Sequence, residues 1–482
     1  MGGATMDDTE LPGGEPPDPD WVDEVLLRGA ADQVCLHIGG PVTRAVLRGL
    51  VADRQAALAA AGIRAGATVA LQLPPSLAFV ANLLAVWRTG ARAALLDHRL
   101  TRYETDNILA RLRPAALVSP RQLTGGGLRA YYEVDEAVTT YPDNAIDGPN
   151  ATDGLPAVHA LLQLSSGSTG PSKVIGRTAA SLIAEVDRYT RMDGVPRAGE
   201  RVVLLASMVH VLGLVGGLLY GLHTGVELAV PERVTGDSIL AAVTAGEAPT
   251  TLLGVPFHIE LLASVTDPPR MPRLAGMTTG GELVRPTVFQ AFADRYGVRL
   301  GNMYGMTEVG VIATDLFAEL RPALAPAPGI TVREADGELL IAMPATPYVG
   351  LSDPTRWVDG WLRTKDAGRV DPATGRLTIL GRLDSQVSVG GLKVDLTEVE
   401  QALVDLPEVA EAVVVFDRSI EAYVVLTDDA AAGRLDELVA SRLAGYKRPR
   451  TLHVVARLPR TTTGKLVRDG RVLRATESAP VP

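Results

Sequence analysis

Residues 161–173 are Leu-Leu-Gln-Leu-Ser-Ser-Gly-Ser-Thr-Gly-Pro-Ser-Lys. The apolar start is typical of the end of a buried strand. Gly167 and Gly170 allow positive φ angles and a close backbone approach, and the hydroxyl residues around them add donors beside exposed N–H groups. Lys173 supplies a positive charge, and the spacing of residues 178–192 predicts a helix. A strand, a Gly-rich turn, a lysine and a helix predict a phosphate-binding loop, with an ordinary Ser/Gly connection as the alternative.

The stretch is not a Walker A loop, because Ser172 precedes Lys173 and Val174 follows it. It resembles instead the signature loop of the adenylate-forming superfamily, which contains acyl-CoA synthetases, adenylation domains of peptide synthetases and firefly luciferase. The usual Gly-x-Pro-Lys is Gly-Pro-Ser-Lys here, which we expect to change only the local turn. The resemblance implies that ATP phosphates are held by Ser165, Ser166, Gly167, Ser168, Thr169, Gly170 and Lys173.

The size and charge of the chain exclude several classes of protein. A length of 482 residues favours two or more domains. The net charge of −10 argues against a nucleic-acid partner. One cysteine, Cys35, suits a reducing cytoplasm and permits no internal disulfide. Residues 1–20 are expected to form a disordered tail without a secretory signal.

Apolar segments alternate between strand and helix patterns from Thr43 to Met303. This alternation predicts an α/β fold with mostly parallel sheets. Residues 202–222 lack charges and approach the length of a membrane span, but we expect a buried strand and a buried helix because Ser207 and His210 interrupt them. Short strands after Gly310 predict a small antiparallel sheet or barrel.

The predicted organisation has two folded domains. Residues 21–383 are expected to form a large N-terminal adenylation domain of layered, mostly parallel sheets with helices and a small β-barrel-like subdomain. Residues 384–482 are expected to form a small mobile α+β domain.

A second motif, Asn302-Met-Tyr-Gly-Met-Thr-Glu308, follows a predicted strand. Gly305 permits a tight turn at the strand's carboxyl end, where α/β enzymes bind ligands. A carboxylate there suits Mg²⁺, which takes oxygen ligands, although a solvated surface turn is the alternative. By resemblance, Tyr304 stacks on adenine, Thr307 contacts the α-phosphate, Glu308 binds the metal, and Asn302, Met303, Gly305 and Met306 line the nucleotide site.

Two further segments resemble nucleotide-binding parts of the same superfamily. Gly280-Gly281-Glu282 matches the adenine-binding loop, although most Gly-Gly pairs are turns and the side chain of Glu282 is assigned no role. Residues 360–368 resemble a Trp-x-x-Thr-Gly-Asp segment, with Lys365 in place of its Gly. Asp366 would accept hydrogen bonds from the ribose hydroxyls, whereas a lone Asp in a turn is more often a cap.

The last two motifs concern the small domain. Residues 381–394 resemble the hinge motif, which implies that Arg382 contacts the ribose or phosphates, Asp384 is the pivot and Gly391 lines the path of the thiol. Ser388 stands where a lysine is common. Residues 458–468 resemble the final motif, Pro-x-Thr-x-x-Gly-Lys, and make Lys465 the candidate for the adenylation catalyst. Alone, each segment would be a polar linker or a solvated turn.

The substrate pocket is expected around His210, for which a hydrogen-bonded core histidine is the alternative. Acyl- and aryl-CoA synthetases usually carry Pro-x-x-His here, and Ser207 replaces that Pro. No Asp lies between Ser207 and Gly217 to hold an α-amino group, which indicates a carboxylic acid without one. The expected substrate contacts are His210, Val211, Gly213, Val255, Gly281 and Gly305.

These motifs favour an ATP-dependent carboxylic acid–CoA ligase that uses ATP, Mg²⁺ and coenzyme A and acts on an apolar acid, whether aryl, fatty or polycyclic. One alternative acylates a carrier-protein phosphopantetheine or another nucleophile, and another is a non-catalytic ATP-sensing relative. A homodimer is left open. The Ala, Arg and Gly bias indicates a GC-rich bacterium and a specialised-metabolite pathway such as antibiotic biosynthesis.

Overall fold

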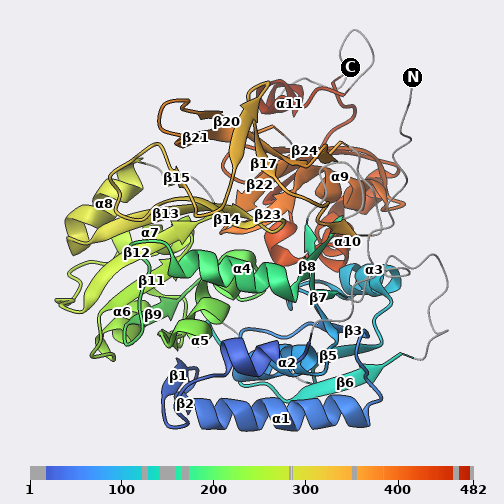
Figure 1. Ribbon diagram of the computed structural model, residues 1–482. Coiled ribbons are helices and arrows are strands. Elements are labelled where there is room, and N and C mark those ends of the chain that lie inside the picture. Colours follow the sequence, from blue (N-terminus) through green and yellow to red (C-terminus); the bar gives the residue numbers. More distant parts are fainter. Residues whose placement is uncertain are drawn as a thin grey trace, which may run out of the picture.

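The structure, a computed structural model, describes residues 18–121, 129–141, 158–165, 173–281, 284, 286–349, 355–383, 385–459 and 466–477. Within these residues, every buried hydrophobic cluster draws its members from one side of residue 384. We therefore call residues 18–383 the large lobe and residues 385–477 the small lobe (Figure 1). Asp384 itself lies outside the described residues, so its role as the boundary stays a prediction.

The larger sheet of the large lobe is mostly parallel, as the alternating pattern predicts. Six neighbouring strands are parallel, namely β1, β10, β9, β11, β12 and β13. Antiparallel strands lie at both edges, with β2 beside β1, and with β14 and β15 beyond β13. The carboxyl ends of β12 and β13 meet at one edge, where Gly280 is in register with Met303. The spatial order is β15 (Ala325–Pro326), β14 (Gly310–Asp315), β13 (Arg299–Met306), β12 (Leu274–Gly280), β11 (Thr250–Gly254), β9 (Arg201–Leu204), β10 (Glu227–Ala229), β1 (Val34–His37) and β2 (Pro41–Thr43).

The second sheet carries both ends of the predicted phosphate loop. Its spatial order is β18 (Tyr348–Val349), β8 (Lys173–Thr178), β7 (His159–Ser165), β4 (Arg92–Leu95), β3 (Thr68–Leu71), β5 (Ala116–Pro120) and β6 (Glu136–Thr140). Ser165 at the end of β7 is in register with Lys173 at the start of β8, and the two strands are antiparallel.

The element that follows Lys173 differs from the prediction. The helix predicted over residues 178–192 is confirmed as α4 (Ala179–Thr190), but strand β8, which was not predicted, begins at Lys173 and precedes it. Val174 and Ile175 are buried and pair with β18 on one side and β7 on the other. Their β-branched side chains favour the extended backbone over the helix. The loop therefore joins two strands of a hairpin.

Helices cover both sheets of the large lobe (Figure 1). Thr43 caps the first helix by accepting a hydrogen bond from the N–H of Val46, as its position predicts. The helices are η1 (Val22–Leu26), α1 (Arg44–Ala60), α2 (Leu77–Arg88), α3 (Arg102–Leu112), α4, η2 (Leu212–Leu219), α5 (Tyr220–Thr224), α6 (Gly236–Thr244), α7 (Pro256–Ala263) and α8 (Pro286–Tyr296).

The uncharged segment 202–222 forms β9, η2 and α5, and most of its apolar residues lie in the core, as expected. Within the described part of the chain, none of the helices combines the length and apolar character that a membrane crossing needs.

A small antiparallel sheet completes the large lobe, as the short strands after Gly310 predict. It contains β16 (Val332–Ala335), β17 (Glu338–Ala342), β20 (Trp361–Val370), β19 (Trp357–Val358) and β21 (Leu377–Arg382). Asp366 on β20 is in register with Arg382 on β21.

The small lobe is an α+β unit above the sheets of the large lobe (Figure 1). Its core lies between α9 and the β24–β25 hairpin. Its elements are β22 (Gln386–Val389), β23 (Leu392–Asp395), α9 (Leu396–Val404), β24 (Val409–Phe416), β25 (Ile420–Leu426), η3 (Asp429–Arg434), α10 (Leu435–Arg442), η4 (Gly445–Lys447), β26 (Thr451–Val454) and α11 (Gly470–Glu477).

Candidate active site

A cavity of about 930 Å³ lies at the carboxyl ends of β12 and β13 and is lined by residues of both lobes. Its size is that of a site for a small ligand or cofactor. It brings together the predicted residues Lys173, His210, Val211, Gly213, Val255, Gly280, Gly281, Asn302, Met303, Tyr304, Gly305, Met306, Thr307, Glu308, Asp366, Arg382 and Gly391.

One end of the cavity is built around Asp366. The Tyr304 hydroxyl donates to Asp366 Oδ2 at 2.6 Å, and Arg382 Nη1 donates to Oδ1 at 3.0 Å. Burial raises the pKa of Tyr304 well above its usual value, and the charge of Asp366 adds to this effect. Tyr304 therefore stays a protonated donor. The pairing of β20 with β21 places Asp366 beside Arg382, which fixes an aromatic ring, a carboxylate and a guanidinium at one edge of the cavity.

A second group surrounds Glu308, which is 5% exposed. The Tyr348 hydroxyl donates to Glu308 Oε1 at 2.9 Å, and Arg356 Nη2 lies 3.8 Å from the same oxygen. The pKa of Tyr348 is raised by burial and then by the negative charge of Glu308. Lys173 Nζ lies 5.4 Å from the centre of the Tyr348 ring. Two cations and one carboxylate thus face the same part of the cavity.

The donor set around Glu308 fits a magnesium ion that arrives with phosphates. No cluster of three His, Cys, Asp or Glu side chains suited to a metal occurs among the residues that the structure describes. Mg²⁺ usually takes only one or two carboxylates and completes its shell with phosphate oxygens and water. A single buried carboxylate beside the cations of Lys173 and Arg356 would meet that requirement.

His210 ends the turn that leads into η2 and lines the cavity, to which its side chain is exposed. Desolvation by the surrounding protein lowers the pKa of His210, and the nearby charge of Asp97 opposes this only in part. The neutral ring can therefore donate one hydrogen bond and accept another. Ala206, Val209 and Val311 provide apolar surface elsewhere in the cavity.

The small lobe closes the cavity with the turn between β22 and β23. Gly390 and Gly391 have φ angles of +57° and +82°, which suit a two-residue hairpin turn. A Cβ on Gly391 would lie 2.5 Å from Val255 Cγ2, so only glycine fits there. Lys393 Nζ donates to the carbonyl of Gly281 at 2.6 Å. In this structure the turn between β22 and β23 thus lies against the large lobe, beside the predicted substrate residues Val255 and Gly281.

Several predicted residues lie outside the described part of the chain: Ser166, Gly167, Ser168, Thr169, Gly170, Glu282, Asp384 and Lys465. The side chain of Ser165 is also not described. Next to Lys465, Leu466 packs in the small-lobe cluster that includes Val413, Tyr423 and Leu473. None of these four residues is among the described residues that line the cavity.

The sequence predicts no role for Tyr348, Arg356, Lys393 or Gln163, all of which line the cavity or contact its lining residues. Tyr348 and Arg356 follow Glu308 by 40 and 48 positions and lie in no motif. Only the pairing of β18 with β8 could have indicated that Tyr348 lies near the site. Gln163 lies within the quoted stretch and donates to the carbonyl of Val209 at 2.8 Å. It could have been found from its place as a polar residue within an apolar strand.

Comparison with known proteins agrees with this arrangement. The model of the AMP-binding enzyme family matches residues 32–341, and that of the AMP-binding enzyme C-terminal domain matches residues 398–465. A feruloyl-CoA synthase from Amycolatopsis is 29% identical over 91% of this chain and 94% of its own. A 4-chlorobenzoate–CoA ligase from Arthrobacter is 27% identical over 86% of each.

Among solved structures, an amide bond synthetase from Marinactinospora thermotolerans superposes with a TM-score of 0.76 at 25% identity, covering 95% of this chain and 99% of that one. The first family match alone covers more than half of the sequence. The chain belongs to the AMP-binding enzyme family.

Proposed function

We propose that the chain is an ATP-dependent carboxylic acid–CoA ligase that acts on an aryl acid. The observation that carries this proposal is that one cavity is lined by all four parts of the predicted site. These parts are the Tyr304–Asp366–Arg382 group, the Lys173–Glu308 group, His210 and the Gly391 turn. Relatives named for feruloyl and chlorobenzoate substrates support the aryl class. Apolar cavity residues such as Ala206, Val209 and Val311 are compatible with a ring.

The first step joins the acid to AMP. The substrate carboxylate attacks the α-phosphorus of ATP, the bond to the β-phosphate oxygen breaks, and acyl-AMP and pyrophosphate form. Tyr304 and Asp366 hold the adenosine, while Lys173 and Arg356 balance phosphate charge. Glu308 would hold Mg²⁺, which supplies further charge neutralisation when bound. The protein's work is positioning and electrostatic stabilisation, since little covalent chemistry is required of it.

The second step transfers the acyl group to sulfur. The thiolate of coenzyme A attacks the acyl carbon, AMP leaves, and the thiol proton is released to solvent. The Gly391 turn beside Val255 lines the path of the thiol. His210, neutral at pH 7, orients the acyl carbonyl or carboxylate through a hydrogen bond. We assign adenylation to a second lobe orientation that carries Lys465 to the cavity by rotation at Asp384, because one site must serve two geometries.

A second candidate keeps the adenylation and changes the acceptor to an amine or a carrier-protein phosphopantetheine. The structural similarity to an amide bond synthetase supports an amine as the acceptor and leaves the adenylation step unchanged. We further place the enzyme in the cytoplasm of a bacterium and in a specialised-metabolite pathway such as antibiotic biosynthesis, because of its single cysteine and its Ala, Arg and Gly bias.

Pyrophosphate release with a panel of benzoic, cinnamic, fatty and polycyclic acids, with and without coenzyme A, tests the proposal. We expect release with aryl acids and an acyl-CoA product when coenzyme A is present. Release without any CoA ester would favour the second candidate. No release with any acid would contradict catalysis and favour an ATP-sensing protein.

A further inference from the structure

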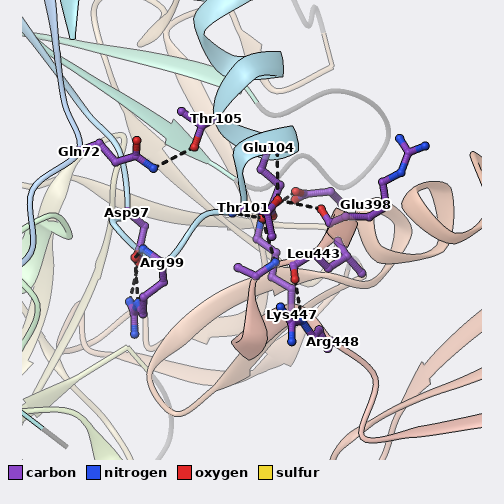
Figure 2. A network of polar contacts seen from close by, with 12 residues as sticks. Gln72, Asp97, Arg99, Thr101, Glu104, Thr105, Glu398, Leu443, Lys447 and Arg448 are labelled. Carbon is purple, nitrogen blue, oxygen red and sulfur yellow. Dashed lines mark hydrogen bonds and ion pairs between the residues drawn. The ribbon is translucent and has the colours of Figure 1, made fainter. Parts of the chain in front are cut away.

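Lys447 of the small lobe joins the two lobes through one ammonium group. It is 8% exposed and ends the short helix η4. Its Nζ lies 2.8 Å from Glu398 Oε1 of its own lobe and 2.9 Å from Glu104 Oε1 on α3 of the large lobe (Figure 2). Burial alone would lower the pKa of Lys447, but the charges of Glu398 and Glu104 outweigh it and raise that pKa. Lys447 is therefore charged at neutral pH and bridges both lobes.

The contacts around this bridge are polar. The N–H of Ala444 donates to Glu104 Oε2 at 2.9 Å, and Thr101 Oγ1 lies 3.2 Å from the carbonyl oxygen of Arg442. The Arg442 guanidinium lies 4.2 Å from the centre of the Tyr103 ring, and that of Arg99 lies 5.1 Å from the Tyr446 ring. Interfaces between domains that move are more polar than permanent ones, and these contacts have that character.

Both charged groups keep partners on their own lobe if the bridge opens. Glu104 Oε2 accepts from the N–H of Thr101 at 2.9 Å and lies 2.9 Å from Thr101 Oγ1, within the capping box of α3. Lys447 keeps Glu398. Breaking a buried ion pair is costly when one charge is left without a partner. Separation here strands neither charge, so the contact can form and release reversibly.

The bridge belongs to one particular orientation of the small lobe. In that orientation Gly391 packs against Val255, Lys393 donates to Gly281, and Tyr446 and Lys447 line the cavity beside α3. A rotation that withdraws the Gly391 turn would also carry Lys447, which lies in the same lobe, away from Glu104. The bridge and the docked turn must therefore form and break together.

We propose that Lys447 and Glu104 are positioning residues that form an inter-lobe latch and hold the orientation used for acyl transfer to the thiol. The latch opens when the small lobe turns for adenylation. It thereby sets the balance between the two half-reactions and takes no part in the bond changes of either. This proposal rests on the two-step function above.

The variant Glu104→Gln tests the latch with little risk to folding, because Gln also supports a capping box and Lys447 keeps Glu398. We expect thioester formation from supplied aryl-AMP and coenzyme A to fall about tenfold. Pyrophosphate release with ATP and the acid should stay unchanged or rise. A second variant, Arg442→Ala, removes only the contact with the Tyr103 ring and should act in the same direction with a smaller effect. Glu437→Gln, at an exposed carboxylate on α10, is the matched control.

A merely structural role would lower both half-reactions equally, and that result would overturn the proposal, as would no change in either rate. A distance measurement keeps the test independent of catalysis. Spin labels at Asn107→Cys on α3 and Ser441→Cys on α10, with Cys35 replaced by Ala, report the separation of the lobes. Glu104→Gln should shift the distance distribution to longer values, and an unchanged distribution would contradict the latch even if no acid were turned over.

Discussion

His210 illustrates at the residue scale how the surroundings set a charge. Desolvation by protein lowers its pKa, the charge of Asp97 raises it in part, and Arg99 and Lys393 lower it further. A lowered pKa means that the ring is neutral at pH 7 and takes up a proton only below its ordinary value of 6.5. The KM for the acid, measured by pyrophosphate release, should therefore be flat between about pH 8 and pH 6.5 and change only at more acidic pH.

The variant His210→Gln is the control for this pH profile, because the amide keeps a donor and an acceptor but does not titrate. Its KM should be higher, and the acidic change attributed to His210 should disappear. If the same acidic change remained in the variant, the titrating group would be another residue and the role of His210 would be contradicted.

Glu308 offers a second prediction at this scale. Its carboxylate is tied to Tyr348 and Arg356 and would have to hold the magnesium ion that accompanies ATP. Glu308→Gln keeps the shape and the bond from Tyr348 but removes the charge. Pyrophosphate release should fall about a hundredfold, and half-saturation should need more Mg²⁺. Tyr348→Phe, which leaves the carboxylate in place, should affect the Mg²⁺ requirement far less, and an equal effect of both variants would argue against Glu308 as the metal-binding group.

At the scale of elements, a buried ion pair supports the turn that follows Glu308. Glu185 on α4 is fully buried, pairs with Arg177 on β8 at 2.9 Å, and accepts from the N–H of Val311 on β14 at 3.1 Å. Gly310 has a φ of +88°, and a Cβ on it would lie 2.1 Å from the carboxyl carbon of Glu185. The strand and helix after the predicted phosphate loop therefore pack directly against the turn that follows Glu308.

Gly310→Ala should destabilise the chain by about 3 kcal/mol or more, because the left-handed backbone and the clash with Glu185 add together. Gly297→Ala is the matched control, since Gly297 has a φ of +64° but a Cβ added there would meet no described atom within 4 Å. That variant should lose only about 1 kcal/mol. Urea unfolding followed by circular dichroism measures both, and equal midpoints would contradict the clash.

The sequence predicts elements well where a regular pattern decides them. The alternation of apolar strands and helices, the cap at Thr43 and the antiparallel strands after Gly310 are confirmed. The helix predicted over residues 178–192 is confirmed as α4, whereas strand β8 before it was not predicted, because its pairing with β7 and β18 depends on residues outside the local pattern. The pairs Glu104–Lys447 and Glu185–Val311 join residues 343 and 126 positions apart, so no local pattern could indicate them.

At the scale of the whole molecule, the lobe orientation decides which loop borders the cavity. Here the Gly391 turn lies against Val255, whereas Leu466, next to Lys465, packs in a small-lobe cluster with Val413 and Leu473. None of those three cluster residues is among the described residues that line the cavity. Under the proposed function, this arrangement suits acyl transfer to a thiol, and we expect a rotation of the small lobe to precede the proposed action of Lys465 on ATP.

Lys465→Ala should therefore affect the two half-reactions unequally. Acyl-AMP formation, measured as pyrophosphate release, should fall about a hundredfold or more, because a cation that stabilises transition-state charge is lost. Thioester formation from supplied aryl-AMP should be nearly unchanged, since the orientation that serves it needs the Gly391 turn and not this lysine. Lys393→Ala, which removes the bond to the Gly281 carbonyl, should show the opposite preference and weaken the thioester step more. Equal loss of both steps in either variant would mean that a single lobe orientation serves the whole reaction.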